Sequence, residues 1–182
     1  MNDAARYFLA IVPPEPVLSQ VLSLKKEACR QFNSCAALKS PSHITLHMPF
    51  LWKEKKIDQL LGALSAFSTG IHYVDIRLNK IGHFGNRVIF LDPEANEDLL
   101  MLQSMLVKTV RLKLKLLNAE YKDRAYQPHM TIAFRDLKKQ VFDEAYEYFT
   151  QKKLSFRFQA KDFALLRHDG KQWHDYKRFG FQ

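Results

Sequence analysis

The chain has 182 residues, 47% of them hydrophobic and 26% charged, which fits a soluble globular domain and excludes a disordered or fibrous chain. No apolar run approaches the roughly 18 residues of a membrane-spanning helix, and the apolar stretch 7–14 is too short for a signal peptide, so we expect a cytoplasmic protein without a membrane partner. The 28 Lys and Arg residues against 19 Asp and Glu give a formal net charge of +9, which favours polyanions such as RNA, although a basic surface also serves solubility.

The pattern of apolar residues predicts alternating strands and helices in the first half of the chain. Stretches rich in β-branched and aromatic residues predict strands, and apolar residues three and four apart predict helices. Pro13-Pro14 ends the first strand, and the Gly and Asn residues of 82–86 allow a hairpin turn. The predicted elements are a strand at 6–13, a helix at 17–32, a strand at 43–52, a helix at 57–67 and strands at 71–81 and 87–91.

The second half repeats this order of elements. The predicted elements are a helix at 96–112, a strand at 129–134, a helix at 141–149, and strands at 154–166 and 173–181 that turn at Asp169-Gly170. The alternating Leu and basic residues of 111–115 are expected to form a solvated helix end, with RNA binding as the alternative.

Together the two halves predict an α+β fold in a single domain over residues 1–182. We expect a bilobal pseudo-twofold duplication, in which two antiparallel β-sheets flank a central groove and helices pack on the outer faces. The lobes would cover about 14–92 and 93–182, with the strand at 6–13 added. Cys29 and Cys35 offer neither a disulfide framework nor a Cys-x-x-Cys pair, so we expect them to serve packing.

One short motif occurs twice, on corresponding strands of the two halves. Residues 43–46 are His-Ile-Thr-Leu and residues 129–132 are His-Met-Thr-Ile, so both are His, apolar, Thr, apolar. Two such matches would arise by chance in roughly one per thousand shuffled sequences, which exceeds the specificity of most short motifs. Because side chains alternate across a strand, the His and Thr of each copy share one face.

This arrangement suits phosphodiester cleavage without a metal. If the halves pair, two imidazoles and two hydroxyls enter one groove. Histidine titrates near neutrality, so one ring can take a proton from water while the other protonates a leaving oxygen. We therefore predict His43 and His129 as catalytic residues, and Thr45 and Thr131 as hydrogen-bond donors to phosphoryl oxygens.

The paired motifs, separated by about half the chain, resemble those of the 2H phosphoesterase superfamily, which includes the LigT-like 2′-5′ RNA ligases and the 2′,3′-cyclic phosphodiesterases. The first strand and the Gly82-His83-Phe84 turn also resemble that family. The resemblance implies a bilobal fold, two catalytic histidines, two phosphate-binding threonines and no required metal or cofactor. The chain departs from the family pattern at Phe134, which precedes Arg135, after the first motif at 47–50, and at the turn, which lacks a Pro. These departures concern the substrate rather than the reaction class.

We expect a phosphodiesterase that opens 2′,3′-cyclic phosphates of RNA ends or small nucleotides to 2′-phosphates, with a reversible 2′-5′ RNA ligase activity that would join RNA ends in the same groove. The resemblance implies that His129 activates water and His43 protonates the departing 3′-oxygen, although pseudo-symmetric halves leave the opposite assignment open. The alternative is a nucleotide- or RNA-binding module without turnover. In either case we expect a monomer with no obligatory protein partner.

Further side chains are weaker candidates for the same groove. Contacts with phosphate or base are expected from Phe84, Arg87, Tyr126 and Arg135, with coverage of the core as the alternative for Phe84. By strand alternation His47 lies on the face of His43, and we expect it at the groove rim. We expect no metal site, and the surface histidines 168 and 174 beside Asp169 and Asp175 are the alternative.

Overall fold

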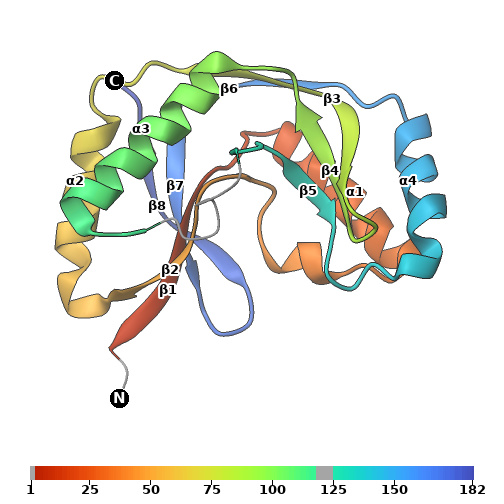
Figure 1. The fold of residues 1–182 in the computed structure, drawn as a ribbon, viewed down its shortest axis with the longest axis horizontal. Helices are drawn as coiled ribbons and strands as arrows, with labels where there is room; N and C mark the ends of the chain where they lie inside the picture. The colour runs from red at the N-terminus through yellow and green to blue at the C-terminus, as the bar shows by residue number, and fades with distance from the viewer. Residues whose placement is uncertain (1–2, 118–124) are drawn as a thin grey trace.

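The structure, a computed structural model, describes residues 3–117 and 125–182 (Figure 1). It has eight strands and four helices in the described part of the chain, joined by short 3-10 turns. In chain order these are β1 (Ala4–Ile11), α1 (Val17–Phe32), η1 (Ala36–Lys39), β2 (Ile44–Lys53), η2 (Glu54–Lys56), α2 (Ile57–Ser68), β3 (Val74–Phe84), β4 (Val88–Pro93), α3 (Glu97–Leu114), β5 (Met130–Ala133), η4 (Lys139–Val141), α4 (Phe142–Gln151), β6 (Phe156–Ala160), β7 (Asp162–His168) and β8 (Trp173–Gly180).

The α+β class is confirmed, but the strands form one curled sheet rather than two separate ones. Its order is β6-β3-β4-β5-β2-β1-β7-β8, and every neighbouring pair is antiparallel. The strands that carry the two motifs, β2 and β5, pair with each other at Ile44 and Met130. This pairing satisfies backbone groups that would otherwise lie at two exposed sheet edges, and it makes the sheet continuous.

The predicted strand at 154–166 is two strands, interrupted at Lys161. β6 pairs with β3, whereas β7 pairs with β1 in the other half of the sheet. The chain therefore crosses from one half of the sheet to the other at this point. Each half of the sheet takes strands from both the first and the second half of the sequence.

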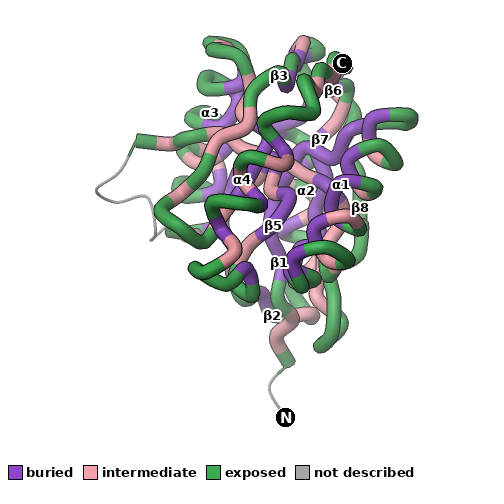
Figure 2. Tube along the Cα trace, turned by 90° about the vertical axis from the view of Figure 1, so that its right-hand side faces the viewer, coloured by how far each residue is buried: buried purple, intermediate pink, exposed green. Residues whose placement is uncertain are grey.

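The helices are divided between the two halves of the sheet. α2 and α3 pack together beside β2 and β8, and α1 and α4 lie beside β3, β5 and β6 (Figure 1). The central strands β1, β5 and β7 are mostly buried, and exposure is concentrated in turns and on the outer helix faces (Figure 2). None of the helices in the described ranges combines the length and apolarity that crossing a membrane requires.

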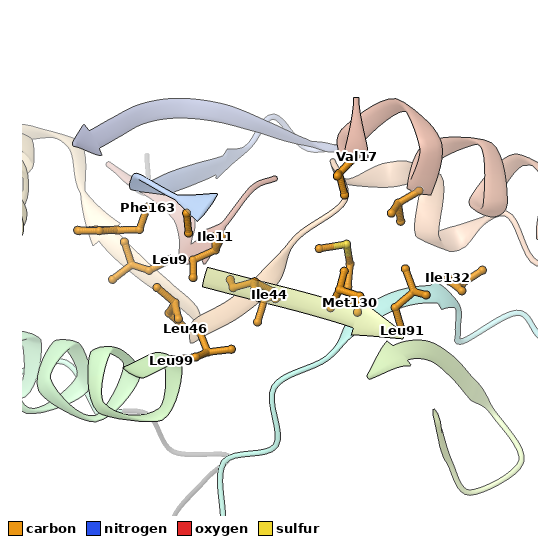
Figure 3. Packing of buried hydrophobic residues seen from close by; sticks show 14 of the residues in the cluster. Leu9, Ile11, Val17, Ile44, Leu46, Leu91, Leu99, Met130, Ile132 and Phe163 are labelled. Carbon is orange, nitrogen blue, oxygen red and sulfur yellow. The ribbon is translucent and has the colours of Figure 1, made fainter. Parts of the chain in front are cut away.

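The apolar residues of both motifs lie in the core. Ile44, Leu46, Met130 and Ile132 are fully buried, and Figure 3 shows Ile44 and Met130 at the junction of the two motif strands. The intervening Thr residues are only half-buried, as the predicted alternation requires. Because the apolar face of each motif strand is buried in the core, the His and Thr side chains lie on the opposite face.

The expectation that Cys29 and Cys35 serve only packing is wrong, because they form a disulfide. α1 ends at Phe32, and Asn33 adopts a left-handed conformation with φ 54°. This reverses the chain, so that the backbone N–H of Ser34 returns to the Ala28 carbonyl at 3.2 Å. The Cα atoms of the two cysteines then lie 4.3 Å apart, close enough to be bridged.

Candidate active site

A groove of about 490 Å³ is lined by residues of both motif strands. His43 and Thr45 line it from the start of β2, and His129 and Thr131 line it from the start of β5. The structure therefore brings the four predicted side chains together, although they come from segments more than 80 residues apart.

Each motif histidine is held at Nδ1 by a backbone carbonyl two residues earlier in the chain. His43 Nδ1 lies 2.7 Å from the Pro41 oxygen, and His129 Nδ1 lies 2.9 Å from the Gln127 oxygen. A carbonyl oxygen only accepts hydrogen bonds, so Nδ1 carries the proton in both rings, and in the neutral ring Nε2 carries the lone pair. Nε2 is therefore the nitrogen that each ring offers to the groove.

Aromatic rings pack against both imidazoles. The ring centroids of Phe8 and His43 are 4.8 Å apart. Phe84 meets His129 edge to face at 4.9 Å, and Phe90 lies 5.2 Å from the same imidazole. These contacts limit rotation of both rings, and Phe84, a predicted base contact, also lines the groove.

The pKa values of both histidines lie below the ordinary value for this side chain. Burial lowers the pKa of His43 most, followed by the positive charge of Lys25, and a charge on His129 lowers it further. Burial also lowers the pKa of His129, against which the Gln127 hydrogen bond and the negative charge of Asp92 raise it. Both rings are therefore neutral at pH 7 in the free protein, and a bound phosphate anion would favour protonation of one of them.

The two threonine hydroxyls are available to a ligand. Thr45 and Thr131 are half-buried, and the structure gives neither hydroxyl a hydrogen-bond partner among the described residues. Each can donate its proton to a phosphoryl oxygen beside the histidine of the same strand.

The groove is electrostatically suited to an anion. Arg6, Lys25, Lys39 and Arg135 line it, and its described lining contains no Asp or Glu. Positive charge without local carboxylates concentrates anions at such a cleft. Some of the excess basic residues of the sequence therefore lie in the lining of the groove.

The other predicted contacts fall in three different places. Arg135 lines the groove, but it lies beyond the end of β5 with φ 61° rather than on a regular strand. Arg87 is exposed in the turn after β3 and lines a neighbouring hollow with Lys139. The Tyr126 hydroxyl donates a 2.8 Å hydrogen bond to the Thr45 carbonyl, so it contacts the backbone of the first motif.

The predicted rim position of His47 is wrong. Only 1% of His47 is exposed, and its Nδ1 lies 2.9 Å from the Met48 carbonyl while Nε2 has no partner in the described structure. The pairing of β1 with β2 shifts register twice, so that Ala10 faces Thr45 whereas Leu9 faces His47. These irregularities break the alternation on which the prediction relied and turn His47 away from the face of His43.

Both surface histidines are hydrogen-bonded within the β7–β8 turn. His174 Nε2 lies 2.7 Å from the Asp169 carboxylate, which also accepts from the backbone N–H groups of Lys171 and Gln172. Over the described ranges, no three His, Cys, Asp or Glu side chains group as metal ligands.

Sequence reasoning missed Lys25 and Trp173 as lining residues. Lys25 stands where the apolar stripe of α1 would place another apolar residue, four positions after Val21. That interruption of the stripe was the available signal. Trp173 packs against Phe8 at 4.6 Å between ring centroids, and its place in the groove depends on β8 pairing with β7, which no local pattern encodes.

Comparison with known proteins gives consistent matches along the chain. Residues 13–172 match the family model described as the 2′-5′ RNA ligase superfamily. A protein of Geobacillus sp. (strain WCH70) that carries the provisional name phosphoesterase is 26% identical over 177 residues, which is 96% of this chain and 95% of that protein.

Solved structures share the fold. The protein TT0787 of Thermus thermophilus has a TM-score of 0.66 at 21% identity, covering 97% of both chains. Escherichia coli LigT in complex with 3′-AMP has a TM-score of 0.62 at 18% identity, covering 98% of this chain and 99% of LigT.

Proposed function

Since the chain belongs to the 2′-5′ RNA ligase superfamily, we propose that it is a 2H-type phosphodiesterase that opens a 2′,3′-cyclic phosphate, at an RNA end or in a small nucleotide, to a 2′-phosphate. The fold is that of LigT, whose solved complex holds 3′-AMP, and a relative carries a phosphoesterase name. With the 5′-hydroxyl of a second RNA end in place of water, the same step would form a 2′-5′ linkage.

One observation carries the proposal: two histidines in the same tautomer share a groove with two threonine hydroxyls that have no hydrogen-bond partner among the described residues. The Nδ1 tethers to Pro41 and Gln127 leave both Nε2 atoms for acid–base work. A single neutral histidine would supply only one proton transfer, whereas ring opening needs one at the attacking water and one at the leaving oxygen.

The reaction then proceeds by in-line displacement at phosphorus. Binding of the phosphate anion first favours protonation of His43 at Nε2. His129 Nε2 then takes a proton from water as the water oxygen bonds to phosphorus, the P–O3′ bond breaks, and His43 Nε2 gives its proton to the departing 3′-oxygen. The Thr45 and Thr131 hydroxyls donate to the two non-bridging oxygens, on which negative charge accumulates. The assignment of base and acid follows the family resemblance, whereas the charges of Lys25 on His43 and of Asp92 on His129 favour the opposite assignment in the free protein.

A direct assay tests this function. We would incubate the purified protein, with EDTA present, with the four nucleoside 2′,3′-cyclic monophosphates and with a short RNA that ends in a cyclic phosphate, between pH 5 and 8. The expected product is the 2′-phosphate, with a bell-shaped pH dependence. A 3′-phosphate product would contradict the mechanism. Saturable nucleotide binding with no turnover at any pH would instead establish the binding module.

A further inference from the structure

Lys25 is a buried cation on a helix face that is otherwise apolar. It lies on α1 among Val21, Leu24 and Ala28, and only 2% of its surface is exposed. No other Lys or Arg in the described ranges is buried to this extent. Burying an ammonium group is costly, so the position requires an explanation.

Lys25 uses only some of its N–H donors in hydrogen bonds to the described residues. Nζ donates to the Ala37 and Ser40 carbonyls, each at 3.2 Å. An ammonium group has three N–H donors, and for the third the described part of the structure gives no acceptor. No carboxylate pairs with it there either. Lys25, Ala37 and Ser40 all line the groove, so this ammonium group lies in its wall.

Lys25 still carries its charge at neutral pH. Burial lowers its pKa to about 8, which leaves the protonated form dominant at pH 7. The charge lies near enough to His43 to lower the pKa of that imidazole, whereas no effect of Lys25 on His129 is resolved. Lys25 Nζ binds the Ser40 carbonyl, and His43 Nδ1 binds the carbonyl of the next residue, Pro41, so the ammonium group lies on the His43 side of the groove.

Two exposed cations line the same groove as Lys25. Lys39 is part of the same 3-10 turn whose carbonyls Lys25 binds, and it lines the groove. The Arg6 guanidinium lies 5.5 Å over the Trp173 ring, which packs on Phe8, the ring that contacts His43. Arg135, which is exposed, also lines the groove. The buried ammonium group of Lys25 thus lies in the wall of a groove with three exposed cations.

We propose that Lys25, with Lys39 and Arg6, forms a second phosphate subsite that binds the phosphodiester next to the reacting cyclic phosphate. The motif side chains engage the reacting group, and the subsite takes the linkage on the 5′ side of the terminal nucleoside. This inference rests on the proposed function and names its substrate class: the end of an RNA strand rather than a mononucleotide. The bound phosphodiester supplies the missing counter-charge and the third acceptor of Lys25.

Two dinucleotides test the subsite on the unmodified protein. Both are uridylyl-uridine with a terminal 2′,3′-cyclic phosphate, one with a natural phosphodiester and one with an uncharged methylphosphonate linkage. We expect kcat/KM to be roughly tenfold to a hundredfold higher for the charged linkage, the range of a charge-assisted hydrogen bond. Equal values would overturn the subsite, and this arm requires no variant to fold.

Substitutions then assign the preference to Lys25. Lys25→Met removes the charge at similar volume and should abolish the preference for the charged linkage. Lys26→Met, at the exposed neighbouring position of the same helix, should retain it. Thermal unfolding of both variants confirms that they are folded.

A second variant separates charge recognition from support of the loop. Lys25 binds carbonyls of the loop 35–40, and the Asp136 carboxylate holds the same loop. It accepts hydrogen bonds from the N–H groups of Cys35 at 2.9 Å and Ala36 at 2.8 Å. Asp136→Asn should lower kcat/KM for both dinucleotides by the same factor. If Lys25→Met also lowers both equally, Lys25 only supports the loop and the subsite is overturned.

Binding keeps this test separate from that of the proposed function. The 2′-phosphate products of both dinucleotides are titrated into the protein by calorimetry. If no cyclic phosphate is turned over, the proposed function fails, yet tighter binding of the charged linkage that is lost in Lys25→Met still supports the subsite. Equal affinities would overturn it whether or not turnover is observed.

Discussion

The two motif histidines are chemically equivalent in tautomer but differ in their electrostatic surroundings. Each donates from Nδ1 to a carbonyl two residues earlier. Lys25 lowers the pKa of His43, whereas Asp92 raises that of His129. The duplicated motif makes the two histidine positions alike. The charged residues that neighbour them, which come from other elements, give the two imidazoles different pKa values.

Removal of either imidazole is expected to remove most of the activity. His43→Ala and His129→Ala should each lower kcat about 10²- to 10⁴-fold, because general acid–base catalysis contributes that much. Both variants should unfold at temperatures close to that of the wild type, since the rings lie at the groove rather than in the core. Wild-type kcat in either variant would contradict the assignment.

A sulfur-substituted substrate separates the acid from the base. A departing thiolate needs no proton, so a cyclic phosphorothiolate with sulfur at the 3′ position should restore much of the rate of His43→Ala but not that of His129→Ala. The opposite pattern would exchange the two roles.

The buried His47 is expected to make folding stability depend on pH. Burial lowers its pKa in the folded state, so below pH 6.5 the unfolded chain binds more protons than the native protein. Stability conferred by neutral His47 is therefore present above its unfolded pKa and is lost as the pH falls below it, by up to about 1.4 kcal/mol per pH unit.

His47→Leu provides the measurement for this effect. Urea unfolding at pH 7 and pH 5 should show a smaller loss of stability in the variant than in the wild type. Identical losses would show that His47 does not control this dependence.

Among the elements, the β3–β4 hairpin determines how tightly His129 is packed. A Cβ atom built on Gly82 would lie 2.4 Å from the Phe90 ring, which itself contacts His129. Because the obstacle is a packed aromatic ring, it cannot move without disturbing the imidazole.

Gly82→Ala should therefore destabilise the protein by about 1–3 kcal/mol, as overpacking does, and should also lower kcat. Gly62→Ala is the matched control, since nothing lies within 4 Å of its Cβ position in α2, and it should stabilise by about 1 kcal/mol. Thermal unfolding and cyclic phosphate turnover measure both effects. A neutral Gly82→Ala would mean that Phe90 is free to rearrange.

Local patterns predicted most elements, and the errors arose where pairing partners decide the outcome. Helical periodicity located α1–α4, and stretches rich in β-branched and aromatic residues located strands that include β2 and β5. The break at Lys161 depends on β6 and β7 joining different neighbours, and the burial of His47 depends on register shifts against β1. Neither is encoded in the residues of the segment itself.

The groove residues divide in the same way. His43, Thr45, His129 and Thr131 were identifiable because strand alternation alone sets their common face. Lys25 was not predicted as a groove residue. Helical periodicity predicts that its position is buried, but it does not indicate that a charged side chain there lines a cavity.

At the scale of the whole molecule, the net charge of +9 should make RNA binding depend on salt. The logarithm of affinity for a short single-stranded RNA should fall linearly with the logarithm of salt concentration. If Lys25 neutralises one phosphate, Lys25→Met should reduce that slope by about 0.7, and Lys26→Met should leave it unchanged. Fluorescence anisotropy between roughly 50 and 300 mM salt provides the measurement. A salt-independent affinity would contradict a groove that binds phosphates.

β2 pairs with β5 at Ile44 and Met130, beside the two proposed catalytic histidines. His43 and His129 immediately precede these two residues. When two parts of a structure rotate about an axis, atoms close to the axis move less than atoms far from it. Small rotations of one half of the sheet against the other would thus open or narrow the ends of the groove for substrates of different bulk, while the two imidazoles stay at nearly constant separation.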